Sequence, residues 1–355
     1  MRKIGTSVYG LRAPIVKQGD DLVNIIVDTV LNSGIEIKDR DVLGITESIV
    51  ARWEGNYVTV DEVAEEIKRI SHNAKCISVW KPIYSRNRFA MILKAIARAA
   101  EEKVRVIVTN KDEVGNVLRH HPFTRLNYDE YYREIVENEG KECEIINWDE
   151  FDGAMRNPDY TIDCRLYSSV ADAPKVLEYE CSLADICKDR CEFGLYGSNK
   201  SNEELLKLFP SQDNAFKLIR EVQDKILQET GHLIEVMVYG DGCFKDPIGG
   251  IWEFADPVVS PAATEGLFGT PNEIKIKNFA DEKYRDLKGE ELNNAIKEEI
   301  KNKLTNLEGN MSSQGTTPRR YVDLLGSLMD LTSGSGDKGT PFVYVQGYFD
   351  NMSNE

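Results

Sequence analysis

The sequence predicts a mixed α+β fold that includes a separate α/β module. Strand-like and helix-like patterns alternate over residues 1–74, and long amphipathic helices with buried strands return after about residue 190. Between them, near residue 75, a strand–helix–strand unit of about 30 residues begins, which has the proportions of a βαβ crossover. We therefore expect residues 75–189 to form a separate α/β module, and we call residues 1–74 and 190–355 the core.

The first part of the core contains four predicted elements. Residues 1–9 predict a strand, and Asp20 and Asp21 predict the cap of a helix whose apolar residues share one face. The apolar run over residues 41–46 predicts a buried strand. Residues 60–71 then predict a second helix with its apolar side facing inward.

The α/β module over residues 75–189 repeats strand and helix patterns. The predicted elements are a strand over 77–80, a helix that starts after Ser85, a strand over 104–109, a helix over 128–138 and a strand over 143–147. The module has no Gly-x-Gly-x-x-Gly sequence, so it carries no signal for a dinucleotide site.

The second part of the core begins with a helix signal and ends with a strand. Residues 201–204 read as a capping box before an apolar run, which predicts the start of a helix. The further predicted elements are a helix over 213–229 that ends at Gly231, a strand over 233–239, helices over 289–306 and 318–330, and a strand over 342–346.

Charge and composition exclude several classes of protein. Lys and Arg number 44 against 60 Asp and Glu, and this net charge of −16 over 355 residues disfavours sequence-independent binding to nucleic acid. No apolar run approaches the roughly 18 residues that cross a bilayer, and the N-terminus has no signal-peptide pattern. We expect a cytoplasmic protein with neither nucleic-acid nor membrane partners.

The cysteines leave two interpretations open. Seven cysteines in a long chain favour reduced thiols. Cys181, Cys187 and Cys191 lie close together in the sequence and offer ligands for zinc or an iron–sulfur cluster. Their spacing matches no Cys-x-x-Cys motif, so buried thiols without a metal are the preferred interpretation.

Two small-residue segments flank predicted strands and could bind an anion or a metal ion. Residues 240–242, Gly-Asp-Gly, are predicted to form a turn after one strand, and the Ser- and Gly-rich residues 333–339 precede another. Glycines let backbone N–H groups approach an anion, and an Asp at a strand end can hold a divalent cation. The alternative for both segments is a tight turn with a positive φ.

Two further segments carry charged residues in suggestive places. Arg319 and Arg320 stand at a predicted helix start, where phosphate binds readily, although a surface cap with solvated charges is the preferred interpretation of this segment taken alone. Residues 252–257 place Glu253 and Asp256 among apolar residues, as in an acid–base site or in a strand edge with outward acids.

Taken in order, several segments resemble the coenzyme F420-0:L-glutamate ligases, also called gamma-glutamyl ligases. The similarity covers roughly residues 1–70 and 190–350. The segments that carry it are 10–14, 18–22, 41–43, 46–55, 194–199, 236–244, 286–292 and 336–347. The resemblance implies a gamma-glutamyl-ligase-like fold in which residues 1–74 and 190–355 form the ligase-like core and residues 75–189 are an inserted α/β module. It also implies a homodimeric enzyme that uses GTP, or ATP, to add L-glutamate to a carboxylate acceptor through an acyl phosphate.

The resemblance also implies roles for individual residues. Arg52 and Lys245 would contact phosphates as catalytic residues, and Asp241 and Asp337 would hold Mg²⁺ or Mn²⁺. The implied nucleotide-binding residues are Ser198, Asn199, Arg319, Ser333, Gly334, Ser335 and Gly336.

The chain departs from the family pattern at several of these positions. Two family lysines are Ser48 and Arg52 here, and a family aspartate is Tyr196. These departures keep a second interpretation open, namely a nucleotide- or cofactor-binding protein that retains the fold without the metal site.

Overall fold

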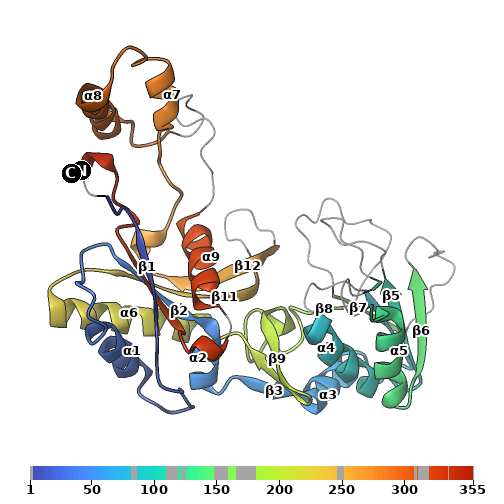
Figure 1. Ribbon diagram of the computed structural model, residues 1–355. Coiled ribbons are helices and arrows are strands. Elements are labelled where there is room, and N and C mark those ends of the chain that lie inside the picture. Colours follow the sequence, from blue (N-terminus) through green and yellow to red (C-terminus); the bar gives the residue numbers. More distant parts are fainter. Residues whose placement is uncertain are drawn as a thin grey trace.

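The computed structural model describes residues 3–80, 86–108, 119–120, 125–147, 159–164, 181–245, 252–307, 310, 320–334 and 336–354. These residues form helices and three β-sheets, so the predicted mixed α+β fold is confirmed (Figure 1). None of the described helices is both long and apolar enough to cross a membrane.

The central sheet joins strands from the two ends of the chain. Its order is β1 (Ser7–Leu11), β13 (Phe342–Gln346), β2 (Val42–Thr46), β11 (Glu235–Lys245) and β12 (Trp252–Ala263). β2 and β11 are parallel and the other pairs are antiparallel. The carboxyl end of β2 therefore lies between the start of β13 and the middle of β11, since Thr46 pairs with Tyr239 and Ile45 with Phe342.

Helices cover both faces of the central sheet. Successive side chains of a strand point to opposite faces, and in these strands the side chains on both faces are apolar. On one face, Leu43 and Ile45 pack with α1 (Leu22–Leu31) and α6 (Gln212–Thr230). On the other face, Val42 packs with Met329 of α9 (Tyr321–Ser333). Figure 1 shows α1 and α6 on one side of these strands and α9 on the other.

A second sheet of five parallel strands comes from one continuous part of the chain. Its order is β6 (Glu142–Asn147), β5 (Lys103–Val108), β4 (Cys76–Trp80), β7 (Tyr160–Asp163) and β8 (Cys181–Ser182). α4 (Arg86–Ala99) and α5 (Tyr128–Asn138) pack against it. Its hydrophobic core continues into α3 (Val60–Ile70), which packs on α4.

A small sheet lies between the two large ones and corrects one prediction. β3 (Tyr57–Thr59), β10 (Leu205–Leu208) and β9 (Ser198–Asn202) are all antiparallel, so residues 201–204 do not cap a helix. They form the turn of the β9–β10 hairpin, in which the Asn202 side chain accepts a hydrogen bond from the Glu204 N–H at 2.9 Å. Pairing with β3, which lies about 150 residues away in the sequence, competes successfully with the local helix signal.

A second correction concerns residues 240–242. They do not end the strand, because β11 continues to Lys245 and pairs with β12, with Gly242 opposite Ala255. The register shifts on both sides of Gly240. Glycine fits such an irregularity, and so the signal for a turn marks a bulged strand instead.

The remaining described helices lie outside these layers. α2 (Glu47–Glu54) directly follows β2 at the sheet edge. α7 (Ile276–Asp281) and α8 (Gly289–Asn302) stand apart from the sheets at one end of the molecule (Figure 1).

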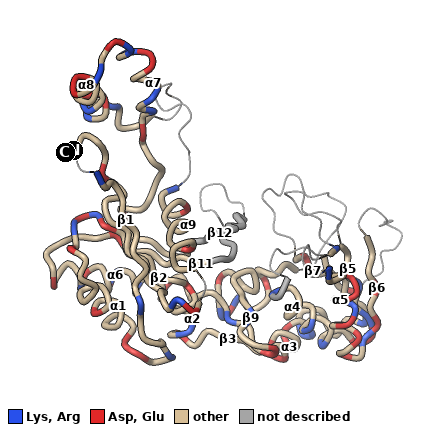
Figure 2. The backbone as a smooth tube through the Cα atoms, viewed as in Figure 1, with Lys and Arg blue, Asp and Glu red and all other residues tan. Residues whose placement is uncertain are grey.

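A cluster of ion pairs ties the parallel sheet to the hairpin. Residues of both charges lie close together around α3, α4 and α5 (Figure 2). Arg98 of α4 contacts the carboxylates of Glu204 at 2.8 Å, Asp61 at 2.8 Å and Glu139 at 2.9 Å, and Lys94 also pairs with Glu204. The bonds from Arg98 and Lys94 lower the pKa of Glu204 from 4.5 to about 2.

This lowered pKa predicts an acid-sensitive contribution to stability. The contribution is present above pH 4.5 and is lost as the pH falls toward 2, because protonation removes the charge that Arg98 binds. Since Glu204 is 53% exposed, we expect only about 1 kcal/mol. Urea unfolding of Glu204→Gln should therefore differ from wild type at pH 6 and converge with it near pH 2.5. A difference that stays constant across this range would contradict the ion-pair explanation.

Candidate functional site

A pocket at the edge of the central sheet collects three segments that are far apart in the sequence. Its volume is about 290 Å³. The segment before α1, the β2–α2 junction and the Gly-rich segment before β13 line it. The lining residues are Ala13, Pro14, Ile15, Val16, Thr46, Ser48, Ile49, Arg52, Ser333, Gly334, Gly336, Gly339, Thr340 and Pro341.

Backbone hydrogen bonds hold these segments together. The Thr46 N–H donates to the Pro341 carbonyl at 3.0 Å, and the Ala13 N–H donates to the Gly339 carbonyl at 3.2 Å. Gly334 and Gly339 have φ values of 59° and 65°, a region that side chains other than glycine rarely adopt. The Gly-rich segment thus provides the wall of the pocket rather than a simple hairpin turn.

The described residues that line the pocket include a cation and no carboxylate, although the chain as a whole is strongly acidic. Arg52 is the charged residue among the described residues that line it, and no Asp or Glu does so. Lys338 adds a second cation nearby, since a Cβ on Gly334 would lie 2.6 Å from the Lys338 Nζ. The helix α2 also begins here without a side-chain cap, so its positive dipole end faces this region. The arrangement favours an anionic ligand.

The middle of β11 lies beside this pocket. Tyr239 pairs with Thr46 across the parallel strands, which places Gly240 and Asp241 next to the start of α2. Gly240 contacts Glu47 so closely that a Cβ on it would lie 2.0 Å from the Glu47 Cγ. Burial is the main cause that raises the pKa of Tyr239 to about 12, so its phenol stays protonated behind the pocket.

A buried ion pair, which the sequence did not reveal, stands between β11 and the hairpin. The Lys207 ammonium of β10 lies 3.3 Å from the Glu47 carboxylate and donates to the Ser48 hydroxyl at 2.6 Å. The side chains of Lys207 and Glu47 are only 11% and 4% exposed. A lysine in an otherwise apolar strand was the available signal, but the false helix signal at 201–204 obscured its position.

The structure brings together only part of the predicted site. Arg52, Ser333, Gly334 and Gly336 line the pocket, whereas the Ser198 hydroxyl is fully buried and donates to the Leu195 carbonyl at 2.6 Å. Asn199 pairs with Lys207 between β9 and β10, one strand away from the pocket.

The predicted metal site stays a prediction. Asp337 lies in a short 3₁₀ turn, Gly336–Lys338, beside the pocket but not on its wall. Asp241 lies in β11, but its side chain and that of Lys245 are outside the described residues, as are Arg319 and Ser335. The described part of the chain contains no group of three or more His, Cys, Asp or Glu residues placed to hold a metal.

The three clustered cysteines are buried and have no metal-binding geometry among the described residues. Burial raises the pKa of Cys191 to about 12 and also raises that of Cys187. These thiols are therefore protonated and poorly nucleophilic at neutral pH.

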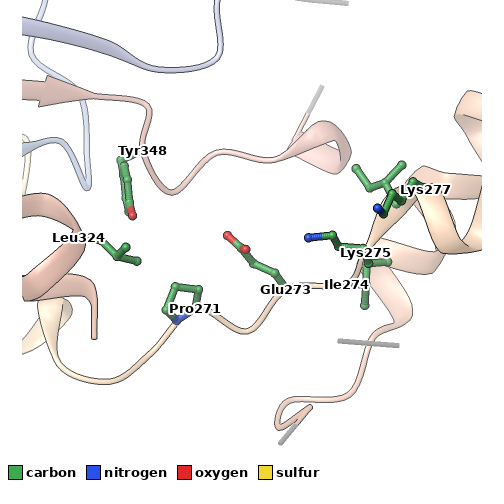
Figure 3. Close-up of a pocket in the computed structure, with 8 residues that line it drawn as sticks. Pro271, Glu273, Ile274, Lys275, Lys277, Leu324 and Tyr348 are labelled. Carbon is green, nitrogen blue, oxygen red and sulfur yellow. The ribbon is translucent and has the colours of Figure 1, made fainter. Parts of the chain in front are cut away.

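A larger and more open pocket lies at the other end of α9. Its volume is about 510 Å³, and Pro271, Glu273, Lys275, Lys277, Leu324 and Tyr348 are among the residues that line it (Figure 3). Acidic and basic side chains both border it, and it is separated from the Gly-rich segment by most of the length of α9. We assign the site to the smaller pocket, because that is where the Gly-rich segment and Arg52 meet.

These features together describe a protein of mixed α+β fold with a small pocket beside its central sheet, lined by Arg52 and the Gly-rich segment. The sequence model of the F420-0:Gamma-glutamyl ligase family matches residues 10–347. The chain therefore belongs to the F420-0:gamma-glutamyl ligase family.

Two relatives match shorter segments. The chain is 33% identical to the coenzyme F420:L-glutamate ligase of Methanothermobacter thermautotrophicus over 61 residues. This matched segment is 17% of this chain and 24% of that protein. Over 50 residues it is 32% identical to an uncharacterized protein of Methanocaldococcus jannaschii, which covers 14% of this chain and 17% of that protein. The matched segments thus span a quarter or less of either relative.

Proposed function

We propose that the protein is an amide ligase that adds L-glutamate to a small carboxylate acceptor, with a nucleoside triphosphate as the source of energy. Family membership supports the reaction class, and the acid-free pocket with Arg52 on its wall is the single observation that supports phosphate binding. GTP is the proposed nucleotide and ATP the alternative.

The proposed reaction needs an activated carboxylate, because a free carboxylate does not form an amide with an amine in water. Transfer of the γ-phosphoryl group to the acceptor carboxylate would give an acyl phosphate, which the glutamate amine attacks with release of phosphate. Arg52 and the α2 N-terminus would stabilise the negative charge on the phosphoryl oxygens, which is usually the largest catalytic contribution.

A divalent cation is part of this proposal. Asp241 is the proposed ligand of Mg²⁺ or Mn²⁺, since it follows Tyr239, which pairs with the pocket residue Thr46, by two residues, and Asp337 is a second proposed ligand. The metal would supply further neutralisation of phosphate charge. Lys245 and Arg319 are proposed to contact phosphates, and Asn199 and the Gly-rich segment to contact the nucleotide.

The organisation of the chain completes the proposal. Residues 75–189, which include all strands of the parallel sheet, are proposed to be an insertion into the ligase core. We further propose a cytoplasmic homodimer without nucleic-acid partners.

Arg52→Met tests the phosphate role of the pocket. We expect the variant to lower the affinity for GTP roughly 10- to 100-fold, because it removes charge-assisted hydrogen bonds, with little change in stability since Arg52 is exposed. Calorimetric titration with GTP or ATP, with and without Mg²⁺ or Mn²⁺, measures this, and phosphate release in the presence of L-glutamate and carboxylate acceptors measures turnover. Arg69→Met, an exposed arginine on α3, is the control.

The outcomes separate the two functions. Nucleotide binding with glutamate-dependent phosphate release supports the ligase. Nucleotide binding without turnover supports the alternative, a binding protein that retains the fold. No binding of either nucleotide would contradict the ligase and would leave only a cofactor-binding protein as the alternative.

A further inference from the structure

The Ser48 hydroxyl occupies an unusual position between Lys207 and the pocket. Ser48 lines the pocket, and its Oγ accepts a hydrogen bond from the Lys207 ammonium at 2.6 Å. An ammonium group has only protons to offer, so Ser48 must be the acceptor of this bond. The proton of Ser48 is then available for a different acceptor.

No described residue provides that acceptor. Within the part of the chain that the structure describes, the Ser48 side chain makes a single hydrogen bond, the one it accepts from Lys207. A hydroxyl that accepts from an ammonium is also polarised by it and becomes a stronger donor. Ser48 is therefore a donor turned toward the space of the pocket.

Glu47 fixes Lys207 in this position. Its carboxylate lies 3.3 Å from the ammonium, in a site so enclosed that Gly240 has no room for a Cβ. The ion pair prevents Lys207 from withdrawing into solvent and compensates the cost of burying its charge. The small side chain of Ser48 leaves room for the ammonium that arrives from β10.

We propose that Lys207 is a positioning residue of the anion pocket, which acts through Ser48 by making its hydroxyl an obligate donor to a phosphoryl oxygen of the ligand. Ser48 and Arg52 are one helical turn apart on α2, so their donors face the same space. This inference rests on the proposed function for the identity of the ligand.

The test uses inorganic tripolyphosphate as the probe, since it carries the phosphates of a nucleotide without the base. Ser48→Ala should lower the affinity for tripolyphosphate roughly tenfold in calorimetric titration at constant ionic strength. Lys207→Met alone would remove the ammonium that balances the charge of the buried Glu47 carboxylate, so the informative variant is the double variant Glu47→Gln/Lys207→Met, which removes both charges.

The double variant separates a positioning role from a structural one. We expect its thermal stability to stay close to wild type while its affinity for tripolyphosphate falls roughly tenfold, and we expect Ser48→Ala to cost much less in this background than in wild type. If the double variant binds tripolyphosphate as tightly as wild type, Lys207 is only structural and the inference is wrong.

Three further outcomes would also overturn the inference. The first is an unchanged affinity for tripolyphosphate in Ser48→Ala, a result that does not depend on how the double variant folds. The others are a wild-type protein that does not bind tripolyphosphate, and variants that change only the binding of L-glutamate. Failure of the proposed function is a separate observation. If the protein binds tripolyphosphate through Ser48 and Lys207 but releases no phosphate with glutamate and acceptors, this inference is supported and the proposed ligase function is wrong.

Discussion

Gly194→Ala is expected to destabilise the protein severely. A Cβ on Gly194 would lie 2.5, 2.6 and 2.7 Å from the carbonyl oxygens of Leu183, Ala184 and Ile186. These contacts involve backbone rather than flexible side chains, so they can be relieved only by moving the chain. In addition, Gly194 has a φ of 54°, which costs a residue with a side chain about 1 kcal/mol or more.

The expected loss is about 3–5 kcal/mol, which is a large fraction of the stability of an ordinary protein. Urea unfolding, followed by circular dichroism, measures it. Gly231→Ala is the matched control, because Gly231 has a φ of 75° and no atom within 4 Å of the added Cβ. The control should lose only about 1 kcal/mol. Equal losses in the two variants would show that the carbonyl contacts at Gly194 do not matter.

Arg88→Met should both destabilise the protein and weaken its ligand binding. Arg88 of α4 is 3% exposed, and its Nη1 donates to the carbonyls of Tyr196 at 2.9 Å and Ser198 at 3.2 Å. These bonds attach the parallel sheet to the segment that leads into β9, whose Asn199 pairs with Lys207. Without them, two buried carbonyls lose a charged donor, and we expect a loss of about 3 kcal/mol.

Arg133→Met is the control for Arg88→Met. Arg133 lies in α5 of the same module and donates to one carbonyl, that of Cys143, at 2.8 Å, away from the pocket. We expect it to lose about 1 kcal/mol and to keep its affinity for tripolyphosphate. The position of Lys207 depends on β9 and β10, so Arg88→Met should lower that affinity several-fold. If both variants bind tripolyphosphate like wild type, the module has no influence on the pocket.

Much of the fold was predictable because the responsible signals are local. The strand over 42–46 and the helices over 60–70 and 128–138 lie within a residue or two of their predicted bounds. Each depends on a side-chain period that the chain carries within itself. Gly231 likewise ends α6 in the left-handed conformation, a helix end that depends on the local backbone and not on distant contacts.

The candidate site was predictable only in part. Arg52 and the Gly-rich segment were found because residue type and motif order mark an anion site, and the structure places them on one wall. Asp241 and Lys245 were found in the same way, and their roles stay predictions. Lys207 and Glu47 were missed, because a lone lysine and a lone glutamate look like solvated charges until they are known to be buried together.

The sequence by itself therefore determined many of the helices and strands, the acidic balance of the chain, its resemblance to a ligase family, and a set of candidate phosphate-binding residues. Only the tertiary structure decided that residues 198–208 form a hairpin, that Gly240 lies in a bulged strand, and that Lys207 reaches Ser48. The physical reason is the range of the interactions. Helix periods and caps act within a few residues, whereas a β-pair or a buried ion pair joins residues 160 positions apart, whose proximity no local pattern records.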